Sequence, residues 1–129
     1  QVFLTSLLAL TMAQAAGPRT CYPAGAGPAS SCAQFIIDFC ADAASKPIRI
    51  GDSKSRCYNL PNGNRCDLIA YNSLNAFAPP SEINCRTVLN DVARRCRAGG
   101  FGKINSGSVY TFTVDPNSGR CATGVQGGS

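Results

Sequence analysis

The residues best suited to chemistry in this chain are polar and aromatic side chains that gather between positions 58 and 75. Planar amides and a carboxylate can satisfy the hydroxyl groups of a neutral sugar, and phenol rings can cover its apolar C–H faces. Turn formation is the alternative role for asparagine, and it explains Asn62 and Asn64 well but the residues after position 70 less well. The candidate ligand-binding residues are therefore Tyr58, Asn59, Asp67, Tyr71, Asn72 and Asn75.

The composition excludes several classes of enzyme. The chain has 129 residues, with no histidine and no tryptophan. Without histidine there is no Ser-His-Asp or Cys-His nucleophile pair, no histidine ligand for zinc and no imidazole general base. The remaining possibilities are a carboxylate-based enzyme, a metal site built from cysteine alone, or a protein that works by binding.

Two further sets of charged residues are candidates for function. Asp38 and Asp42 are four residues apart, and paired carboxylates at about 5–9 Å can cleave a glycosidic bond. An exposed helix face does not provide the burial that a general acid needs, so we expect a solvated surface and no enzyme activity. The basic stripe Arg86, Asn90, Arg94 and Arg97 could meet an acidic partner, although an ordinary exposed face is the simpler interpretation.

Eight cysteines indicate a disulfide-rich protein. The closest two are eight positions apart, which is too far for the C-x2-C pairs of a structural zinc site, so we expect no metal and no cofactor. Up to four disulfides then predict an oxidising compartment and secretion. Roughly a hundred pairings are possible, and the sequence does not choose among them. The cysteines are Cys21, Cys32, Cys40, Cys57, Cys66, Cys85, Cys96 and Cys121.

Two helices are predicted to position these residues. The first covers residues 31–45 and begins with a capping box of Ser31 and Gln34. The second covers residues 82–97, with Ser81 as its N-cap. Each helix carries two cysteines on its apolar face, so we expect disulfides that link the helices to a sheet.

Five short strands are predicted, at residues 48–50, 56–60, 65–72, 108–114 and 120–123. An Asn-Gly turn joins the second strand to the third, and Cys57 and Cys66 on either side of this hairpin could face each other. Residues 17–29 are predicted to be an irregular loop, residues 101–107 another loop and residues 115–119 a turn. The order of elements predicts a single α+β domain with a mixed or antiparallel sheet of about five strands.

Residues 1–16 are uncharged, apolar and signal-like, and they end in the small residues of a cleavage site, although a positive n-region is missing. The alternative is a retained N-terminal helix of about four turns, buried on two sides. The segment is too short for a transmembrane span, so we expect no membrane insertion. No run of Lys and Arg exceeds two residues, so we expect no nucleic-acid partner. The remaining residues, 17–129, form the predicted disulfide-rich domain.

Four segments resemble the small secreted glycan-binding proteins of ink-cap mushrooms and their fungal relatives. They are SSCAQFIIDFCADA, RCYNLPNGNRCDLIAYNSLN, INCRTVLNDVARRC and GSVYTFTVDPNSGRC, together with the spacing of all eight cysteines. The resemblance implies an αβα sandwich, a homodimer that pairs edge to edge into a continuous sheet, and lectin activity towards fucose- or N-acetylgalactosamine-containing glycans. It carries over no site residue.

A secreted fungal lectin without catalytic activity is therefore the expected function, with glycans or glycoproteins as partners. The competing resemblance is to the killer toxins and effectors of fungi, which are also small α+β disulfide scaffolds and act on a protein or channel. We place the dimer contact at the edge strand 120–123, which has no proline and only one charge to protect it from pairing.

Overall fold

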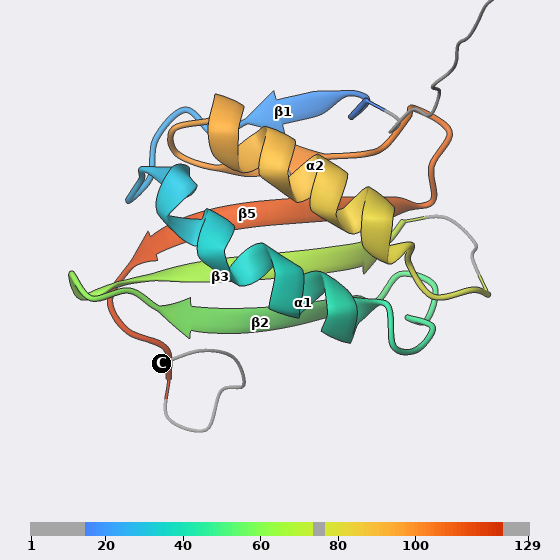
Figure 1. Cartoon of the computed structure of the whole chain (residues 1–129), viewed down its shortest axis with the longest axis horizontal. Coiled ribbons are helices and arrows are strands. Elements are labelled where there is room, and N and C mark those ends of the chain that lie inside the picture. The colour runs from blue at the N-terminus through green and yellow to red at the C-terminus, as the bar shows by residue number, and fades with distance from the viewer. Residues whose placement is uncertain (1–14, 74–76, 123–129) are drawn as a thin grey trace, which may run out of the picture.

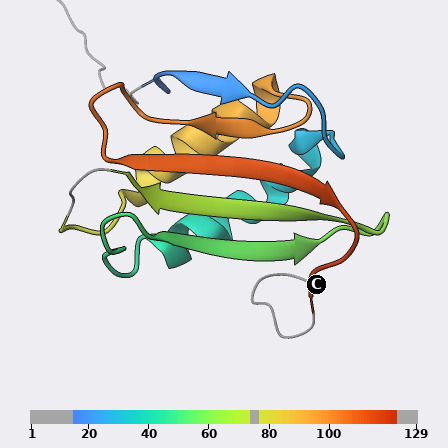
Figure 2. The same cartoon turned by 180° about the vertical axis from the view of Figure 1, so that it is seen from behind.

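The structure is a computed structural model, which describes residues 15–73 and 77–122. A five-stranded sheet forms one layer, and two helices lie across one of its faces (Figure 1). Seen from behind, the other face of the sheet carries no described helix (Figure 2). The predicted single α+β domain with five strands and disulfide links is confirmed.

All neighbouring strands of the sheet are antiparallel, in the order β1-β4-β5-β3-β2. The long strands β5 and β3 pair along nine residues in the centre, and β1 and β2 form the two edges. The strands are β1 (Arg19–Cys21), β2 (Ser53–Asn59), β3 (Asn64–Asn72), β4 (Gly100–Gly102) and β5 (Tyr110–Ser118).

The helix layer consists of α1 (Ile36–Ala43), preceded by the 3-10 helix η1 (Ala29–Phe35), and of α2 (Glu82–Arg95). The predicted N-cap of α2 is confirmed, because the Ser81 hydroxyl accepts a hydrogen bond of 3.1 Å from the Asn84 amide. The resemblance implied helices on both faces of the sheet. Both described helices lie on one face, and the helix considered for residues 1–16 falls almost wholly outside the described residues.

The predicted capping box of the first helix is wrong. The helical segment begins two residues earlier, after Pro28, and its first turns are 3-10 rather than α-helical. Gln34 donates its side-chain amide to the Ser31 carbonyl oxygen at 2.9 Å, so it does not reach back to a free backbone amide as a capping box requires.

Two strand predictions and one turn prediction are also wrong. Residues 48–50 and the described residues 120–122 form no strand, and residues 115–118, predicted to lie in a turn, continue β5. Residues 19–21, predicted to be a loop, form edge strand β1 because they pair with the short strand β4. Gly100 permits this pairing, since a Cβ atom there would collide with the Thr20 carbonyl oxygen.

The core lies between the helices and the inner face of the two central strands. Leu68 of β3 and Phe112 of β5 point into it and contact the apolar faces of the helices, where Phe39 and Leu89 are fully buried. Burial of each such side chain contributes about 1.5–3 kcal/mol to folding. The alternation of strand residues therefore assigns one face of the sheet to the core.

Four disulfides hold the layers together, and all eight cysteines take part. One of them links helix to sheet as predicted, by joining η1 to β3. A second joins α1 to α2, and the remaining two fasten β1 to the end of α2 and β2 to the C-terminal segment. The pairs are Cys32–Cys66, Cys40–Cys85, Cys21–Cys96 and Cys57–Cys121.

The expected contact between Cys57 and Cys66 does not form. Cys57 lies opposite Asp67 and Cys66 lies opposite Tyr58, so the two cysteines belong to opposite faces of the hairpin. Because side chains alternate along a strand, residues one step out of register cannot meet.

None of the described helices has the length and apolar character needed to cross a bilayer.

Asn72 is a fully buried polar residue at the end of β3, and its amide donates a hydrogen bond of 2.8 Å to the Ile48 carbonyl oxygen. We expect Asn72→Ala to lower the free energy of unfolding by about 1–3 kcal/mol, because the substitution removes a partner of a buried backbone group. Urea denaturation with the disulfides intact measures the loss. The exposed Asn90→Ala is the control, with an expected change within about 0.5 kcal/mol, and equal stability of the two variants would contradict a structural role for Asn72.

Candidate functional site

The open face of the sheet, turned away from the helices, is the candidate site (Figure 2). Its side chains come from alternate positions of all five strands, and the register places them in rows across the sheet. One half of the face carries hydroxyl, aromatic and aliphatic groups, and the other carries charges and amides. The rows are Ser53, Tyr71 and Thr111; Ser55, Ile69, Thr113, Phe101 and Thr20; Cys57, Asp67 and Asp115; and Asn59, Arg65 and Asn117.

Two aromatic rings are accessible in the first half of the open face. Tyr71 is 40% exposed and Phe101 is 37% exposed. Phe101 also contacts the ring of Tyr22, with the centroids 6.0 Å apart and the planes tilted by 56°. The threonines at 111 and 113 lie next to these rings on β5. Apolar ring faces beside hydroxyl groups are suited to a ligand with both C–H and O–H surfaces.

The hydroxyl of Tyr22 stays protonated at neutral pH. Burial raises the pKa of Tyr22 above its usual value of 10.0, the negative charge of Asp115 raises it further, and a hydrogen bond with Thr113 opposes these effects. A protonated phenol can donate a hydrogen bond. Tyr22 therefore adds a donor next to the aromatic half of the face.

The second half of the open face is a connected polar network. Asp67 accepts hydrogen bonds from Arg65 at 3.0 Å and from the Asn117 amide at 2.7 Å. Arg65 also donates to the Ser118 carbonyl oxygen at 2.6 Å, which ties β3 to the end of β5. Asn59 accepts a hydrogen bond of 2.6 Å from the Cys121 amide. These contacts hold the polar groups in fixed positions, as a preorganised binding surface requires.

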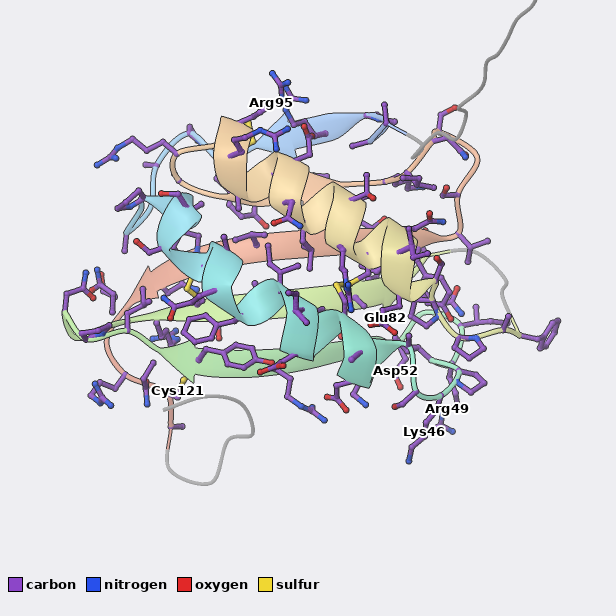
Figure 3. All side chains as sticks on the ribbon, viewed as in Figure 1. Lys46, Arg49, Asp52, Glu82, Arg95 and Cys121 are labelled. Carbon is purple, nitrogen blue, oxygen red and sulfur yellow. A yellow bond between two sulfur atoms is a disulfide. The ribbon has the colours of Figure 1, made fainter. Side chains whose placement is uncertain are left out.

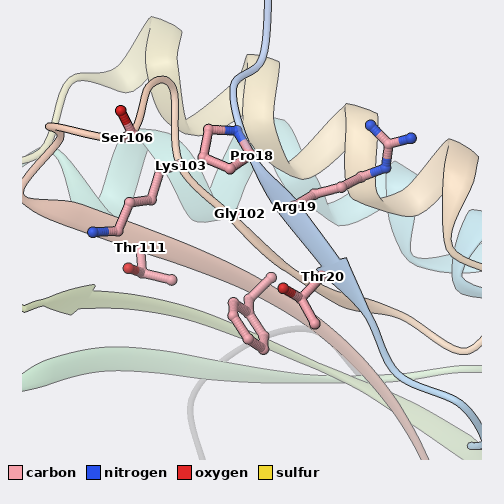
Figure 4. A pocket seen from close by; sticks show the side chains of 8 residues that line it. Pro18, Arg19, Thr20, Gly102, Lys103, Ser106 and Thr111 are labelled. Atoms are coloured by element: carbon pink, nitrogen blue, oxygen red, sulfur yellow. The ribbon is translucent and has the colours of Figure 1, made fainter.

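A shallow pocket of about 250 Å³ opens at the edge of the aromatic half (Figure 4). Its lining is mostly apolar and includes Phe101 together with the hydroxyl groups of Thr20, Ser106 and Thr111 and the amine of Lys103. Ligand sites commonly have volumes of about 300–1,000 Å³, so this pocket suits a single sugar ring or a similar small group.

The structure brings together three of the six candidate residues. Asn59 of β2 and Asp67 and Tyr71 of β3 share the open face, because all three occupy strand positions whose side chains point to that side. Asp67 forms an ion pair of 3.0 Å with the neighbouring Arg65.

Two other candidates point to the helix side instead. Tyr58 is 6% exposed and stacks on Phe35, with ring centroids 4.6 Å apart and an angle of 12° between the planes. Burial, with a smaller contribution from Asp42, raises the pKa of the Tyr58 hydroxyl. Asn72 is fully buried and bonded to the backbone, so neither residue is available to a ligand. Asn75 lies outside the described residues.

The sequence did not point to Tyr22, Thr20 or Phe101. These residues belong to two segments that were predicted to be loops, and the strands β1 and β4 within them have only three residues each. Three residues are too few to show the alternation of a strand. The pattern Gly100-Phe101-Gly102 was the only available signal, since two glycines allow close approach of another backbone.

Of the two carboxylates suggested for catalysis, Asp38 is exposed and Asp42 has structural partners. Asp42 forms ion pairs with Lys54 at 3.3 Å and with Arg56 at 2.8 Å, which fasten α1 to the edge strand β2. Among the described residues, no group of three His, Cys, Asp or Glu side chains is arranged to hold a metal ion.

Comparison with known proteins identifies the family of the chain. The family described as "Glycan binding domain Y3" matches residues 31–121 of the chain. A curated relative, "Antiviral protein CAP" from Coprinus comatus, is 44% identical over 96 residues, which cover 73% of this chain and 94% of the relative. The match includes both helices and four of the five strands described above. The chain belongs to the glycan-binding domain Y3 family.

Proposed function

We propose that the protein is a secreted lectin that binds fucose- or N-acetylgalactosamine-containing glycans on the open face of its sheet and performs no catalysis. The observation that carries the proposal is the open face itself. Within the described residues no helix covers it, and it exposes Tyr71 and Phe101 among fixed hydroxyl, amide and charged groups. A surface of this composition is suited to sugars, whose rings have an apolar face and a polar rim.

The division of the open face into two halves fits the proposed sugars. Fucose carries a methyl group at carbon 6, and N-acetylgalactosamine carries an acetamido methyl group. These apolar groups can contact the rings and Ile69, while sugar hydroxyls reach Thr111 and Thr113. The network around Asp67 offers further acceptors to a longer glycan.

Secretion is the second part of the proposal. Four disulfides persist only in an oxidising environment, and here they fasten every layer of the fold. Residues 1–16 then act as the export signal, and residues 17–129 form the exported glycan-binding domain.

We also propose a homodimer, but we place its contact on a different strand from the one predicted from the sequence. The predicted edge strand at 120–123 is not formed in its described part, and the observed edges are β1 and β2. We place the contact at β2, which has seven residues against three in β1. Lys54 and Arg56 are bound to Asp42, so their charges protect this edge poorly against pairing with a second copy.

The aromatic rings provide the first test. We expect Tyr71→Ala and Phe101→Ala each to lower glycan affinity about three- to tenfold, because each removes one ring contact worth about 0.5–1.5 kcal/mol. A glycan array identifies the best ligand, and isothermal titration calorimetry with that ligand measures the loss. Ile83→Ala is the matched control, since Ile83 is 72% exposed but lies on α2 behind the sheet.

Three results would contradict this part of the proposal. They are an array without hits, equal loss of affinity in the Ile83 control, and cleavage of the bound glycan detected by mass spectrometry. The alternative toxin or effector function predicts activity on target cells that free sugar does not block, whereas a lectin acting through glycans is inhibited by its own ligand.

Sedimentation velocity tests the dimer. We expect a species of twice the mass of the exported chain, residues 17–129, at micromolar concentration. Ser55 lies near the middle of β2, so Ser55→Asp would place two like charges close together in a symmetric pair and shift the equilibrium to monomer. Thr20→Asp makes the same change on the other edge strand and leaves the dimer intact. A monomeric wild-type protein, or dissociation by the Thr20 variant alone, would refute the β2 contact.

A further inference from the structure

A cluster of three arginines lies at the other side of the molecule, where strand β1 meets the last turns of α2. Arg19 from β1 and Arg94 and Arg95 from α2 surround the carboxylate of Asp91. Figure 3 shows Arg95 at this end of α2, beside β1. The cluster lies on the helix side of β1, because Arg19 pairs with Asp91 of α2 whereas its neighbour Thr20 belongs to a row of the open face. Of the three arginines, Arg19 also lines the pocket at the edge of that face.

The distances show that the arginines are only partly used by this carboxylate. Arg95 Nε lies 3.0 Å from one oxygen of Asp91, and Arg19 Nη1 lies 3.2 Å from the other. Arg94 Nη2 is 3.9 Å away, which is beyond a hydrogen bond, and its side chain is 66% exposed. Each guanidinium carries five N–H donors, so most donors of the three groups do not serve Asp91.

The local charge favours an added anion. Three arginines contribute +3 and Asp91 contributes −1, which leaves +2 in one small region. Of the seven acidic residues, all of them within the described part of the chain, Asp91 is the one that pairs with these arginines. Asp91 also lines the hollow but is only 8% exposed, and the arginines around it outnumber it three to one.

Covalent and backbone links hold the cluster in place. Cys21 is two residues after Arg19 and forms a disulfide with Cys96, the residue after Arg95. The pairing of β1 with β4 fixes the other side of Arg19. The backbone positions of Arg19 and Arg95 are therefore fixed relative to each other, which lowers the entropic cost of binding an anion between them.

A hollow of about 410 Å³ lies over the cluster. The three arginines and Asp91 form one part of its lining, Thr87 and Asn90 on the same face of α2 add a hydroxyl and an amide, and Ala15 and Ala16 complete it. Removal of residues 1–16 as an export signal would take away the two alanines and leave the charged and polar groups in place. These neutral donors are suited to the remaining oxygens of a tetrahedral oxyanion. The hollow has room for one or two such groups with part of the molecule that carries them.

We propose that this hollow binds the sulfate groups of an acidic glycan. The proposal rests on the glycan binding of the family. Its site is distinct from the open face, because Arg94 and Arg95 line the hollow but not the pocket beside Phe101, whereas Arg19 borders both. Arginine binds sulfate with paired, charge-assisted hydrogen bonds. A compact site of charge +2 matches one or two sulfates, whereas a nucleic-acid duplex requires a longer row of cationic groups along its phosphates.

Arg94→Gln is the variant that tests the site. Its side chain is exposed and outside hydrogen-bonding distance of Asp91, so the fold does not depend on it. We expect the wild-type protein to bind a heparin-derived tetrasaccharide at 0.1 M NaCl and Arg94→Gln to bind it about fivefold more weakly, since one charge-assisted contact is lost. Arg49→Gln is the control, because it removes the same charge from an exposed position far from Arg95 in Figure 3.

The outcomes are distinct. Retained affinity in the Arg49 variant and no binding of the desulfated tetrasaccharide support the site. Equal weakening in both variants would show attraction by net charge alone and overturn it, as would a wild-type protein that does not bind the sulfated probe. Tighter binding of a short DNA duplex, weakened by Arg94→Gln, would assign the hollow to nucleic acid instead.

The affinity for a neutral glycan distinguishes the proposed sulfate site from the proposed site on the open face. Arg94→Gln is expected to bind the neutral ligand like the wild type, and Tyr71→Ala is expected to keep its affinity for the sulfated tetrasaccharide. A variant that loses both affinities would show that the two ligands share one site, and would refute the independent hollow.

Discussion

The structure depends on one constraint, which is that the helices of the described residues all lie on one face of the central strands β3 and β5. Cys66 on the inner side of β3 is joined to η1, and Cys40 joins α1 to α2, so the helix layer cannot move to the other face. Strand residues alternate between the faces, so this choice also decides which side chains meet solvent on the opposite side. The composition of the open face is thus a consequence of where the disulfides hold the helices.

The same alternation explains why only part of the candidate site was predictable. The sequence placed Tyr58, Asn59, Tyr71 and Asn72 in one cluster because they are close along the chain. Neighbours in a strand point to opposite faces, so one member of each pair reaches the open face and the other is buried against the helices. The kinds of residue were predictable from their chemistry, but the assignment to a face required knowledge of which face the helices cover.

The fold was predictable where a local signal is strong. Ser81 and the apolar spacing of α2 define a long helix, and the Asn62-Gly63 turn defines the hairpin of β2 and β3. Strands β1 and β4 were not predictable, because three-residue strands exist only through pairing with distant segments. The disulfide pairing could not be predicted from the sequence either, since partners such as Cys21 and Cys96 are 75 residues apart and meet only in the folded protein.

The short edge strand β1 connects the two proposed binding surfaces. Thr20 in the middle of β1 completes a row of the open face, and Arg19 immediately before it completes the arginine cluster. Both positions depend on the register of β1 with β4 and on the Cys21–Cys96 disulfide that holds β1 against the end of α2. Three residues of backbone pairing alone are a weak constraint on the position of β1. The covalent link therefore helps to hold this edge, which contributes to the open face on one side and to the arginine cluster on the other.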